Sequence, residues 1–538
     1  MAMGLRAPFT MVAADDGNFD YNETVVVESS QKSCRDFWIR PTGGVVNQQG
    51  PFTFTIDAMA DRYLHFNSAR LEMKVKVTKA DGSNLHVWHD VVAPINLLGV
   101  TMWETVEVFV NGKPFTGASS VNAGYKGYLE TLLSNEASAT NHLTTQFFHM
   151  DTHDNYNIMR LDKKFAKEHY VMCISSGDIA RPILPADIRR EAAEGPENEE
   201  LARAVFLPTI DTEDDAFKIT ALDTTEGRRK KALVLRRAVY QQDFRNMCNR
   251  IAYAICKPGQ TANVGYLDRF TKCSGSTPWD MYSPIQHDFF RLNNHVGPGN
   301  KLDIKFSRYP DAFLLGSNNQ QEQYRLMIMD MRLHLRTIER KERVHPPLQE
   351  GYRMNETQLL KQVVPQNSPN ASFRIHHGGV MPKTIVLTMV PTVSADGVYG
   401  ENPLNLHHYH ASNISLQING EMFPAGGIDY DFKSFNPHVS RGYMWTLENT
   451  GERAKTRGNL VDWKTFQAGG FTSAFDLTYD RCNGIHNHDA QYGYIDVNIK
   501  FSEPTVEACY ILYYMMFTKV LLNDKMGGQM LALDIAAS

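Results

Sequence analysis

The chain is poor in cysteine, and its few cysteines follow no recognisable spacing. Seven are spread over 538 residues with no C-x-x-C pair: Cys34, Cys173, Cys248, Cys256, Cys273, Cys482 and Cys509. An odd, scattered set argues against a disulfide framework and against a structural zinc site, because both need characteristic spacings. We therefore expect synthesis in a reducing compartment.

Long apolar runs and a strong net charge are also missing. The nearest approach to the roughly 18 apolar residues of a membrane span is ACYILYYMMFTKVLL, residues 508–522, which Lys519 interrupts. We expect that run to form a buried strand pair or one long strand. No continuous apolar core precedes Asp15, so no signal peptide is expected. The net charge of -5 gives no global reason to bind nucleic acid or an acidic membrane.

The dominant local signal is an alternation of apolar and polar residues. Leu71, Met73, Val75 and Val77 share one face of a predicted strand, and charged residues share the other. This period of two is typical of a half-buried β-strand. We predict similar half-buried strands at FTFTI (52–56), KTIVLTMV (383–390) and YIDVNIKF (494–501), separated by loops rich in Gly, Pro, Asn and Asp. The protein is therefore expected to be mostly β.

Two distant segments carry the same pattern. VEVFVNGKPF (106–115) and ISLQINGEMF (414–423) each place an alternating strand before an Asn-Gly pair. Asn-Gly is well suited to the positive φ angles of a tight hairpin turn. We predict such turns at Asn111-Gly112 and at Asn419-Gly420.

Other landmarks recur in the same order. They are ADG (80–82 and 395–397), G-Y-x-x-T-L (127–132 and 442–447) and IKFS (304–307 and 499–502). Tyr128 precedes Ile304 by 176 residues, whereas Tyr443 precedes Ile499 by 56, so the first copy carries about 120 additional residues. We interpret the chain as two versions of one β domain, the first with an insertion.

The predicted organisation follows from this repeat. Residues 1–20 form an N-terminal arm, 20–338 the first β domain, 340–522 the second and 523–538 a C-terminal tail. The insertion, within about 140–270, is rich in charges and helix formers and should lie outside the β cores. An eight-stranded jelly roll is one of few solutions for each antiparallel domain of this size. The predicted fold class is all-β, with two tandem jelly rolls and a large, partly helical insertion in the first.

Two histidine pairs are the main candidates for chemistry. A His-x-His on a strand places both imidazoles on one face, as metal-binding barrels of the cupin type require. The sequence offers His408 with His410 and His486 with His488. No Glu follows His410 at ligand spacing, and the first half contains no such pair. We favour loop and surface histidines over a metal site.

No other catalytic motif is convincing. The segment HMDTH (149–153) has the spacing of a helical zinc pair, but Met150 stands where a metalloprotease needs Glu. Neither a Gly-rich phosphate loop after a strand nor a G-x-S-x-G turn is present. We predict no catalytic residue, no cofactor and no metal, and the protein is not expected to be an enzyme.

One local run is strongly basic. It contains Arg228, Arg229, Lys230, Lys231, Arg236 and Arg237. This charge is enough to neutralise several phosphates if it faces nucleic acid. A solvated or inter-subunit face is the favoured interpretation, because a charge run alone specifies no partner. The run is a candidate assembly or DNA-facing segment.

Several longer segments resemble the double jelly-roll major capsid proteins of Maverick or Polinton elements and adintoviruses. They are YKGYLETLLSN (125–135), TQFFHMDT (145–152), LDIKFSRYPDAFLL (302–315), EQYRLMIMDMRLHLR (322–336), NPLNLHHYHASNISLQINGEMFP (402–424), TSAFDLTYD (472–480) and YIDVNIKFSEPTVEACYILYY (494–514). Each is a packing or turn motif, so their number and order carry the resemblance. The part around 180–250 matches nothing in that family.

The resemblance implies a structural role. Such proteins form hexon-like homotrimers with six near-equivalent sides, which tile an icosahedral shell around double-stranded DNA. The implied partners are further copies of the chain, penton and minor capsid proteins, and packaged DNA bound non-specifically at most. The implied location is the virion capsid, after synthesis in the host cytoplasm and assembly in the nucleus. A two-roll cupin metalloenzyme and a carbohydrate-binding viral β-sandwich remain the alternatives.

Overall fold

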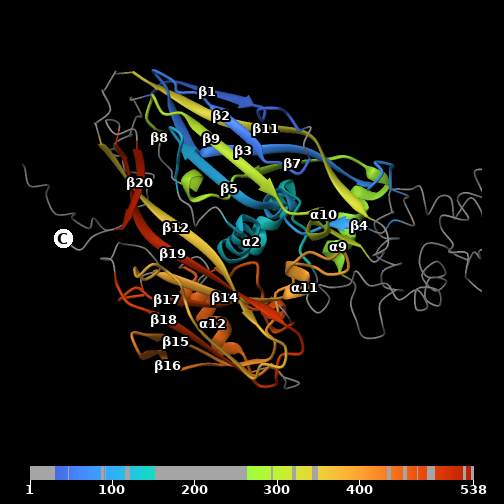
Figure 1. Ribbon diagram of the computed structural model, residues 1–538, viewed down its shortest axis with the longest axis vertical. Helices are drawn as coiled ribbons and strands as arrows, with labels where there is room; N and C mark the ends of the chain where they lie inside the picture. The colour runs from blue at the N-terminus through green and yellow to red at the C-terminus, as the bar shows by residue number, and fades with distance from the viewer. Residues whose placement is uncertain are drawn as a thin grey trace, which may run out of the picture.

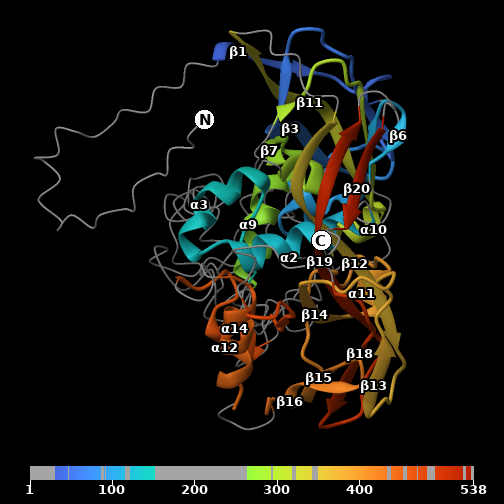
Figure 2. The same ribbon diagram turned by 90° about the vertical axis from the view of Figure 1, so that its left-hand side faces the viewer.

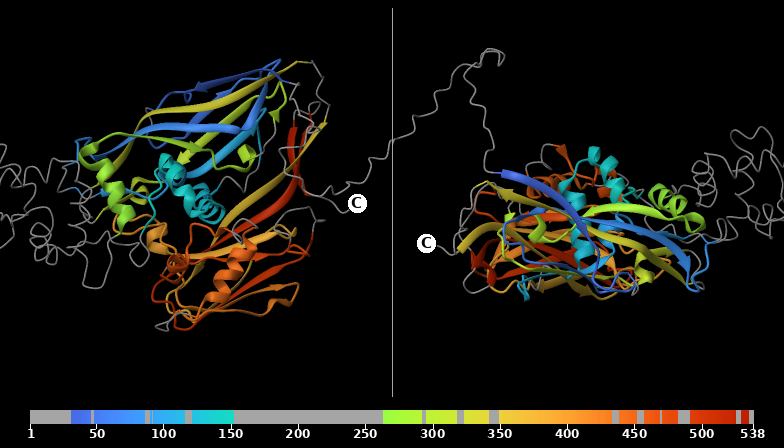
Figure 3. Two further views of the ribbon diagram at one scale, coloured as in Figure 1. Left: turned by 180° about the vertical axis from the view of Figure 1, so that it is seen from behind. Right: turned by 90° about the horizontal axis from the view of Figure 1, so that it is seen from above.

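The computed structural model describes residues 31–45, 48–85, 90, 92–115, 121–151, 263–291, 295–317, 323–341, 349–432, 438–451, 457–468, 470–481, 491–524 and 529–534. These residues form two β-sandwiches that lie side by side, with helix α2 (Ala123–Ser134) between them (Figure 1). The long strands of both sandwiches run in broadly the same direction (Figure 3). Buried residues of the two sandwiches belong to one continuous hydrophobic cluster.

The first sandwich contains two antiparallel sheets. One has the order β1 (Gln31–Ile39), β11 (Tyr324–Arg340), β3 (Tyr63–Lys79) and β7 (Trp279–Pro284), with β8 (His295–Val296) also paired to β3. The other has the order β2 (Phe52–Ile56), β9 (Leu302–Arg308), β5 (Trp103–Val110) and β6 (Lys113–Pro114). A small two-stranded sheet pairs β4 (Val92–Pro94) with β10 (Leu315–Ser317).

The second sandwich repeats the arrangement of the two four-stranded pairings. Its first sheet has the order β12 (Gln349–Val364), β19 (Cys509–Asp524), β14 (Thr384–Pro391) and β17 (Ser473–Asp476), with β20 (Gln529–Asp534) paired to β19. Its second sheet has the order β13 (Asn370–Arg374), β18 (Ile495–Phe501), β15 (Ala411–Ile418) and β16 (Glu421–Asp429). Strand β20 lies within the segment predicted as a C-terminal tail.

This pairing order is that of a jelly roll. When the eight main strands of each sandwich are numbered along the chain, both sandwiches pair them as 1-8-3-6 in one sheet and 2-7-4-5 in the other. The predicted fold class, two tandem eight-stranded jelly rolls, is therefore confirmed. The two sandwiches are equivalent in topology.

Short helices fill the connections between strands. Those of the first sandwich are α1 (Leu98–Thr101), α2, η3 (Ala137–Ala139), α3 (Thr140–Leu143), η4 (Thr144–Gln146), α9 (Val264–Cys273), η6 (Ser274–Ser276), η7 (Asp288–Arg291) and α10 (Asp311–Leu314). Those of the second are α11 (Thr392–Ala395), α12 (Ser440–Asn449) and α14 (Trp463–Ala468). Figure 2 shows α2, α3, α12 and α14 gathered on one side of the strand layers. None of the helices in the described part of the chain is long and apolar enough to cross a membrane.

The two repeated phrases occupy equivalent hairpins. Strands β5 and β6 are joined by Asn111 and Gly112, whose φ angles are 50° and 79°. Strands β15 and β16 are joined by Asn419 and Gly420, with φ angles of 50° and 91°. Positive φ at both central residues is the signature of a type I′ turn, which Asn-Gly adopts readily.

The IKFS phrase lies on equivalent strands in the two halves, but its residues do not occupy equivalent positions on those strands. Strand β9 pairs with β5, and Ile304 lies opposite Val108. Strand β18 pairs with β15, and Ile499 lies opposite Ile414, two residues farther from the Asn-Gly turn. Val497 is therefore the structural counterpart of Ile304. A shift of two residues keeps every side chain on its own face, so the phrase matches in pattern rather than in position.

Burial confirms the predicted alternation for several strands and overturns it for β14. In β3, Leu71, Met73, Val75 and Val77 are buried, and the residues between them are more exposed. Strand β14 is instead buried on both faces from Ile385 onward, because its second face packs toward the first sandwich. Strand β19 is one long strand, which was one of the two alternatives predicted for this run, and its residues Ile511–Met515 are likewise buried on both faces. Strands covered on both faces are near-continuous in apolar residues.

Candidate functional site

In the described part of the chain, the candidate functional site is the interface between the two sandwiches, which we call the seam. Helix α2 forms its centre (Figure 1). On the side of the first sandwich, two glycines let the helix approach closely. A Cβ added at Gly124 would lie 2.4 Å from the carbonyl oxygen of Thr101, and one at Gly127 would lie 2.3 Å from Cγ1 of Val100. Glycine at these two positions therefore permits α2 to pack closely against α1.

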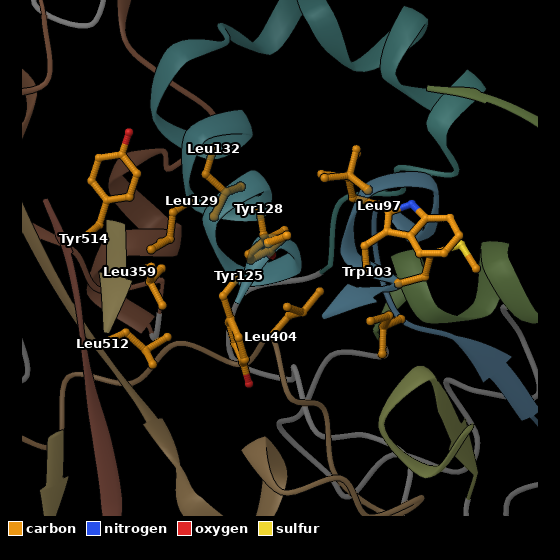
Figure 4. Packing of buried hydrophobic residues seen from close by; sticks show 14 of the residues in the cluster. Leu97, Trp103, Tyr125, Tyr128, Leu129, Leu132, Leu359, Leu404, Leu512 and Tyr514 are labelled. Carbon is orange, nitrogen blue, oxygen red and sulfur yellow. The ribbon is translucent and has the colours of Figure 1, made fainter. Parts of the chain in front are cut away.

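The opposite side of α2 packs on the second sandwich through apolar side chains. Leu129, Leu132 and the tyrosines of the helix lie beside Leu359 of β12, Leu512 of β19 and Leu404 (Figure 4). Leu129 and Leu359 are almost completely buried. Each fully buried leucine stabilises the packed state by about 1.5–3 kcal/mol. Apolar burial is thus the main force that holds the two jelly rolls together.

A buried ion pair of the first sandwich lies at the seam, between α2 and η7. The Nζ atom of Lys126 lies 3.1 Å from Oδ1 of Asp288, and both side chains are fully buried. Thr357 of β12 donates two hydrogen bonds to the same carboxylate, from its backbone N–H at 2.8 Å and from its hydroxyl at 2.7 Å. Burial raises the pKa of Asp288, but the charges of Lys126 and Arg291 and the bond from Thr357 lower it more, so the carboxyl stays ionised. The two bonds from Thr357 link this pair to β12 of the second sandwich.

A second polar group lies one helical turn along α2. Glu130 forms an ion pair with Arg291 of η7 and accepts a hydrogen bond from the hydroxyl of Tyr514 in β19 at 2.9 Å. Burial, with the nearby charge of Glu130, raises the pKa of Tyr514 well above its usual value. The phenol therefore remains a donor at any physiological pH. Helix α2 is bonded to both sandwiches at this point.

Beside this group the seam is incompletely filled. A partly open cavity of about 360 Å³ lies between α2, the end of β7 and the outer face of β14 and β19. Its lining combines apolar and polar side chains, including Leu129, Leu133, Phe290, Val386 and Met516 with Glu130, Arg291 and Tyr514. The cavity lies where the two sandwiches meet, so its shape depends on their relative position.

The ends of the insertion are held together by one buried arginine. Arg269 of α9 donates to the carbonyl oxygen of Pro94 at 2.8 Å and to that of His149 at 2.9 Å, and its guanidinium pairs with Asp151 at 2.8 Å. Arg269 is completely buried. Residues 152–262 therefore leave and re-enter the first sandwich at one anchored point, close to β4, and the expected helices and the basic run at Arg228–Arg237 lie outside the described residues.

The histidine pair of the cupin alternative lacks the geometry of a strand. His408 and His410 precede β15, in a turn where Tyr409 and His410 have positive φ angles of 44° and 53°. The His408 ring stacks on Phe432, and burial followed by the neighbouring histidines lowers its pKa to about 3. His486, His488 and His153 lie outside the described residues. No group of three potential metal ligands occurs within the described ranges.

Sequence reasoning missed the residues that build the seam. Lys126 and Arg269 are charged residues that a sequence pattern assigns to the surface, yet both are fully buried. The available signal was the pair Gly124 and Gly127, three residues apart before an apolar stretch, which indicates close packing on one side of a helix. The repeated G-Y-x-x-T-L phrase lies on α2 and α12, but as a landmark of the repeat it predicted neither a helix nor the surface that the helix contacts.

Comparisons with known proteins bear on the fold. No family model matches the sequence, and no curated protein matches it. A chain in a cryo-EM structure of the Sputnik virophage is similar over 100% of this chain and 96% of its own length, with a TM-score of 0.52 and 11% sequence identity. The mavirus major capsid protein aligns over 100% of this chain and 97% of its own, with a TM-score of 0.47 and 10% identity. The Sputnik likeness shows that the chain shares the fold of a virophage protein.

Proposed function

We propose that this chain is the major capsid protein of a double-stranded DNA virus or of a virus-like element, acting as a structural protein rather than an enzyme. The single observation that supports this most is the tandem pair of jelly rolls with the same strand pairing, together with the full-length likeness to a chain of the Sputnik virophage. Because the two sandwiches are equivalent in topology and joined by a buried interface, one chain can supply two similar units to an assembly.

In this proposal, three copies close into a capsomer with six near-equivalent sides, and capsomers tile an icosahedral shell. When one surface of a protein binds a different surface of its neighbour, the copies form a closed ring if the rotation between them closes. Self-association also covers strand edges that would otherwise remain exposed. Penton and minor capsid proteins and non-specifically held DNA are the further partners, and assembly takes place in the nucleus.

A finer assignment rests on the segments that resemble Maverick or Polinton and adintovirus proteins. We place the first jelly roll at about 20–338 and the second at 340–522, with an N-terminal arm before residue 20. The insertion leaves the first sandwich beside β4, whereas β8 and β20 lie toward the opposite end (Figure 1). This placement supports a role for the insertion as an outer tower or trimer contact.

Electron microscopy of the purified protein tests the proposal. We expect hexagonal-looking trimers or closed shells. A protein that stays monomeric at every concentration would contradict the proposed function. Stoichiometric metal lost on combining His408→Ala with His410→Ala would favour the cupin alternative, and saturable glycan binding with no assembly beyond a trimer would favour a carbohydrate-binding role.

A truncation tests the arm separately. Deletion of residues 1–20 should leave trimers intact and prevent shell formation, because the arm is proposed to act between capsomers. Normal shells from the truncated chain would remove the arm from the assembly mechanism while leaving the capsid role untouched.

A further inference from the structure

The seam inside the chain joins two particular kinds of surface. One is the helix that follows the fifth main strand of a sandwich, which is α2 in the first sandwich. The other is the outer face of the sheet that contains the third and eighth main strands, which are β14 and β19 in the second. Tyr514 of β19 bonds to Glu130 of α2, and Lys126 contacts the carbonyl oxygen of Thr357 at 3.4 Å.

The same two kinds of surface occur a second time in the chain. Helix α12 is the counterpart of α2, because it follows the fifth main strand β16 and carries the same G-Y-x-x-T-L phrase. When the phrases are aligned, the seam residue Leu129 corresponds to Met444. Leu129 is 1% exposed, whereas Met444 is 44% exposed. Lys126, completely buried, corresponds to Arg441, which is exposed. The face of the helix that α2 buries is therefore open in α12.

The matching sheet face of the first sandwich is open as well. The outer face of β1, β11, β3 and β7 exposes Trp38 at 49% and Tyr282 at 46%. In the second sandwich, the corresponding strands β14 and β19 are buried on both faces over Ile385–Pro391 and Ile511–Met515. The alternation of β3, with polar residues between its buried ones, reflects this single covered face.

The exposed aromatic residues on this sheet are held in place. The guanidinium groups of Arg40 and Arg332 lie 5.6 and 5.0 Å from the ring centre of Trp38. The Tyr282 ring lies 5.5 Å from that of His334, which pairs with Glu72 at 2.6 Å. Aromatic residues fixed by their neighbours lose little freedom on binding, and tryptophan and tyrosine dominate the energy of protein interfaces. This sheet face therefore has the features of a protein-binding surface.

We infer that the outer face of the β1–β11–β3–β7 sheet in one copy of the chain binds helix α12 of a second copy. The contact repeats between chains the relation that α2 has to the β12–β19–β14–β17 sheet within a chain. This inference rests on the proposed function and names the surfaces through which the trimer forms. The interface is heterologous, because the two partners contribute different surfaces, and it closes into a ring when three copies are joined.

Two opposed variants test the assignment. Trp38→Glu places a charge on the sheet face, and Met444→Glu places one on α12; Tyr282→Glu is a second variant on the sheet. Met422→Glu is the matched control, since Met422 is 50% exposed and lies on the face of β16 opposite to Phe423, the residue whose ring contacts Trp445 of α12. All four substitutions are at exposed positions, and unchanged thermal unfolding of the purified variants verifies that they fold.

Sedimentation velocity gives the readout. We expect the unaltered chain and Met422→Glu to form trimers, and each interface variant to need at least about tenfold higher concentration for assembly. Because the contact is heterologous, a mixture of Trp38→Glu and Met444→Glu retains one sound pair of surfaces. The mixture should therefore form dimers with one copy of each variant, and no trimers.

The outcomes separate this inference from the proposed function. If the unaltered chain forms trimers and Trp38→Glu, Tyr282→Glu and Met444→Glu do so equally well, the surface assignment is wrong and the capsid role stands. If the mixture gives no dimers although each variant alone is monomeric, the heterologous pairing is wrong. If the unaltered chain never assembles, the proposed function itself fails.

Discussion

The side-chain oxygen of Asn111 accepts a hydrogen bond of 2.9 Å from the backbone N–H of Lys301, the residue before β9. The second sandwich repeats this contact: the side-chain oxygen of Asn419 accepts from the N–H of Tyr494, the residue before β18, at 3.0 Å. Each Asn also donates its own N–H back to the same residue, at 2.9 and 3.1 Å. The turn residue therefore ties its hairpin to the neighbouring strand in both jelly rolls.

Replacement of either Asn should destabilise its jelly roll. In Asn111→Ala and Asn419→Ala, the side-chain bond is lost and alanine must adopt a positive φ angle, so we expect each to lower the free energy of unfolding by about 1–2 kcal/mol. Urea unfolding measures the effect. Asn→Gly at the same positions is the control, because glycine keeps the backbone conformation and loses only the bond. A clear loss at one turn and none at the other would argue against their equivalence.

Removal of the buried lysine should weaken the seam strongly. Lys126→Met leaves the ionised Asp288 without its counter-charge, and breaking a buried pair in this way costs about 3–5 kcal/mol. The double variant Lys126→Met, Asp288→Asn should recover part of the loss, because it removes the buried charge, and its amide oxygen can accept from the Thr357 N–H while its NH2 group donates to the Thr357 hydroxyl. Chemical unfolding of both variants checks this. Equal stability of the single variant and the unaltered chain would show that the pair contributes nothing.

Loss of the arginine at the base of the insertion should loosen α9. Arg269→Met removes three hydrogen bonds and leaves Asp151 buried without its partner, so we expect a local destabilisation of about 2–4 kcal/mol. Hydrogen exchange of residues 264–273 reports this opening. Arg269→Lys should be intermediate, since lysine keeps the charge but cannot make the forked contacts. Unchanged hydrogen exchange in Arg269→Met would mean that the contacts of Arg269 do not stabilise α9.

The stability of the protein should fall in mild acid because the pKa values of buried histidines are lowered, and His287 is one of these histidines. Burial, reinforced by the charge of Lys126, lowers the pKa of this histidine from 6.5 to about 3. Between these values the unfolded chain binds a proton that the folded chain does not, so stability decreases as the pH falls from 6.5 toward 3. The total contribution reaches about 4–5 kcal/mol at 1.36 kcal/mol per pKa unit.

Urea unfolding at pH 7, 5 and 4 measures this slope. His287→Gln removes the titrating group, so its stability should depend less on pH in that range. The ionised Asp288, whose pKa is lowered from 3.8, contributes its own loss of stability only at lower pH. A variant with the same pH dependence as the unaltered chain would rule out His287 as the cause.

The equivalence of the two sandwiches was accessible to sequence reasoning because its signals are local. Alternation in β3 and Asn-Gly between β5 and β6 depend on residues that are close along the chain. The IKFS phrase was less reliable, since its register relative to the turn differs by two residues between the halves. The alternating pattern identified β18 as a strand, and only the pairing of β18 with β15 and of β9 with β5 showed which of their residues are equivalent.

What the sequence by itself determined was the kind of element and its repetition, since hairpin turns and alternating faces arise from the backbone preferences of neighbouring residues. Only the tertiary structure decided that β14 is covered on both faces, that Lys126 is buried against Asp288, and that Arg269 closes the base of the insertion. Each of these depends on a partner more than 100 residues away or on a second sandwich, and no local pattern specifies which distant surface will exclude water from a side chain.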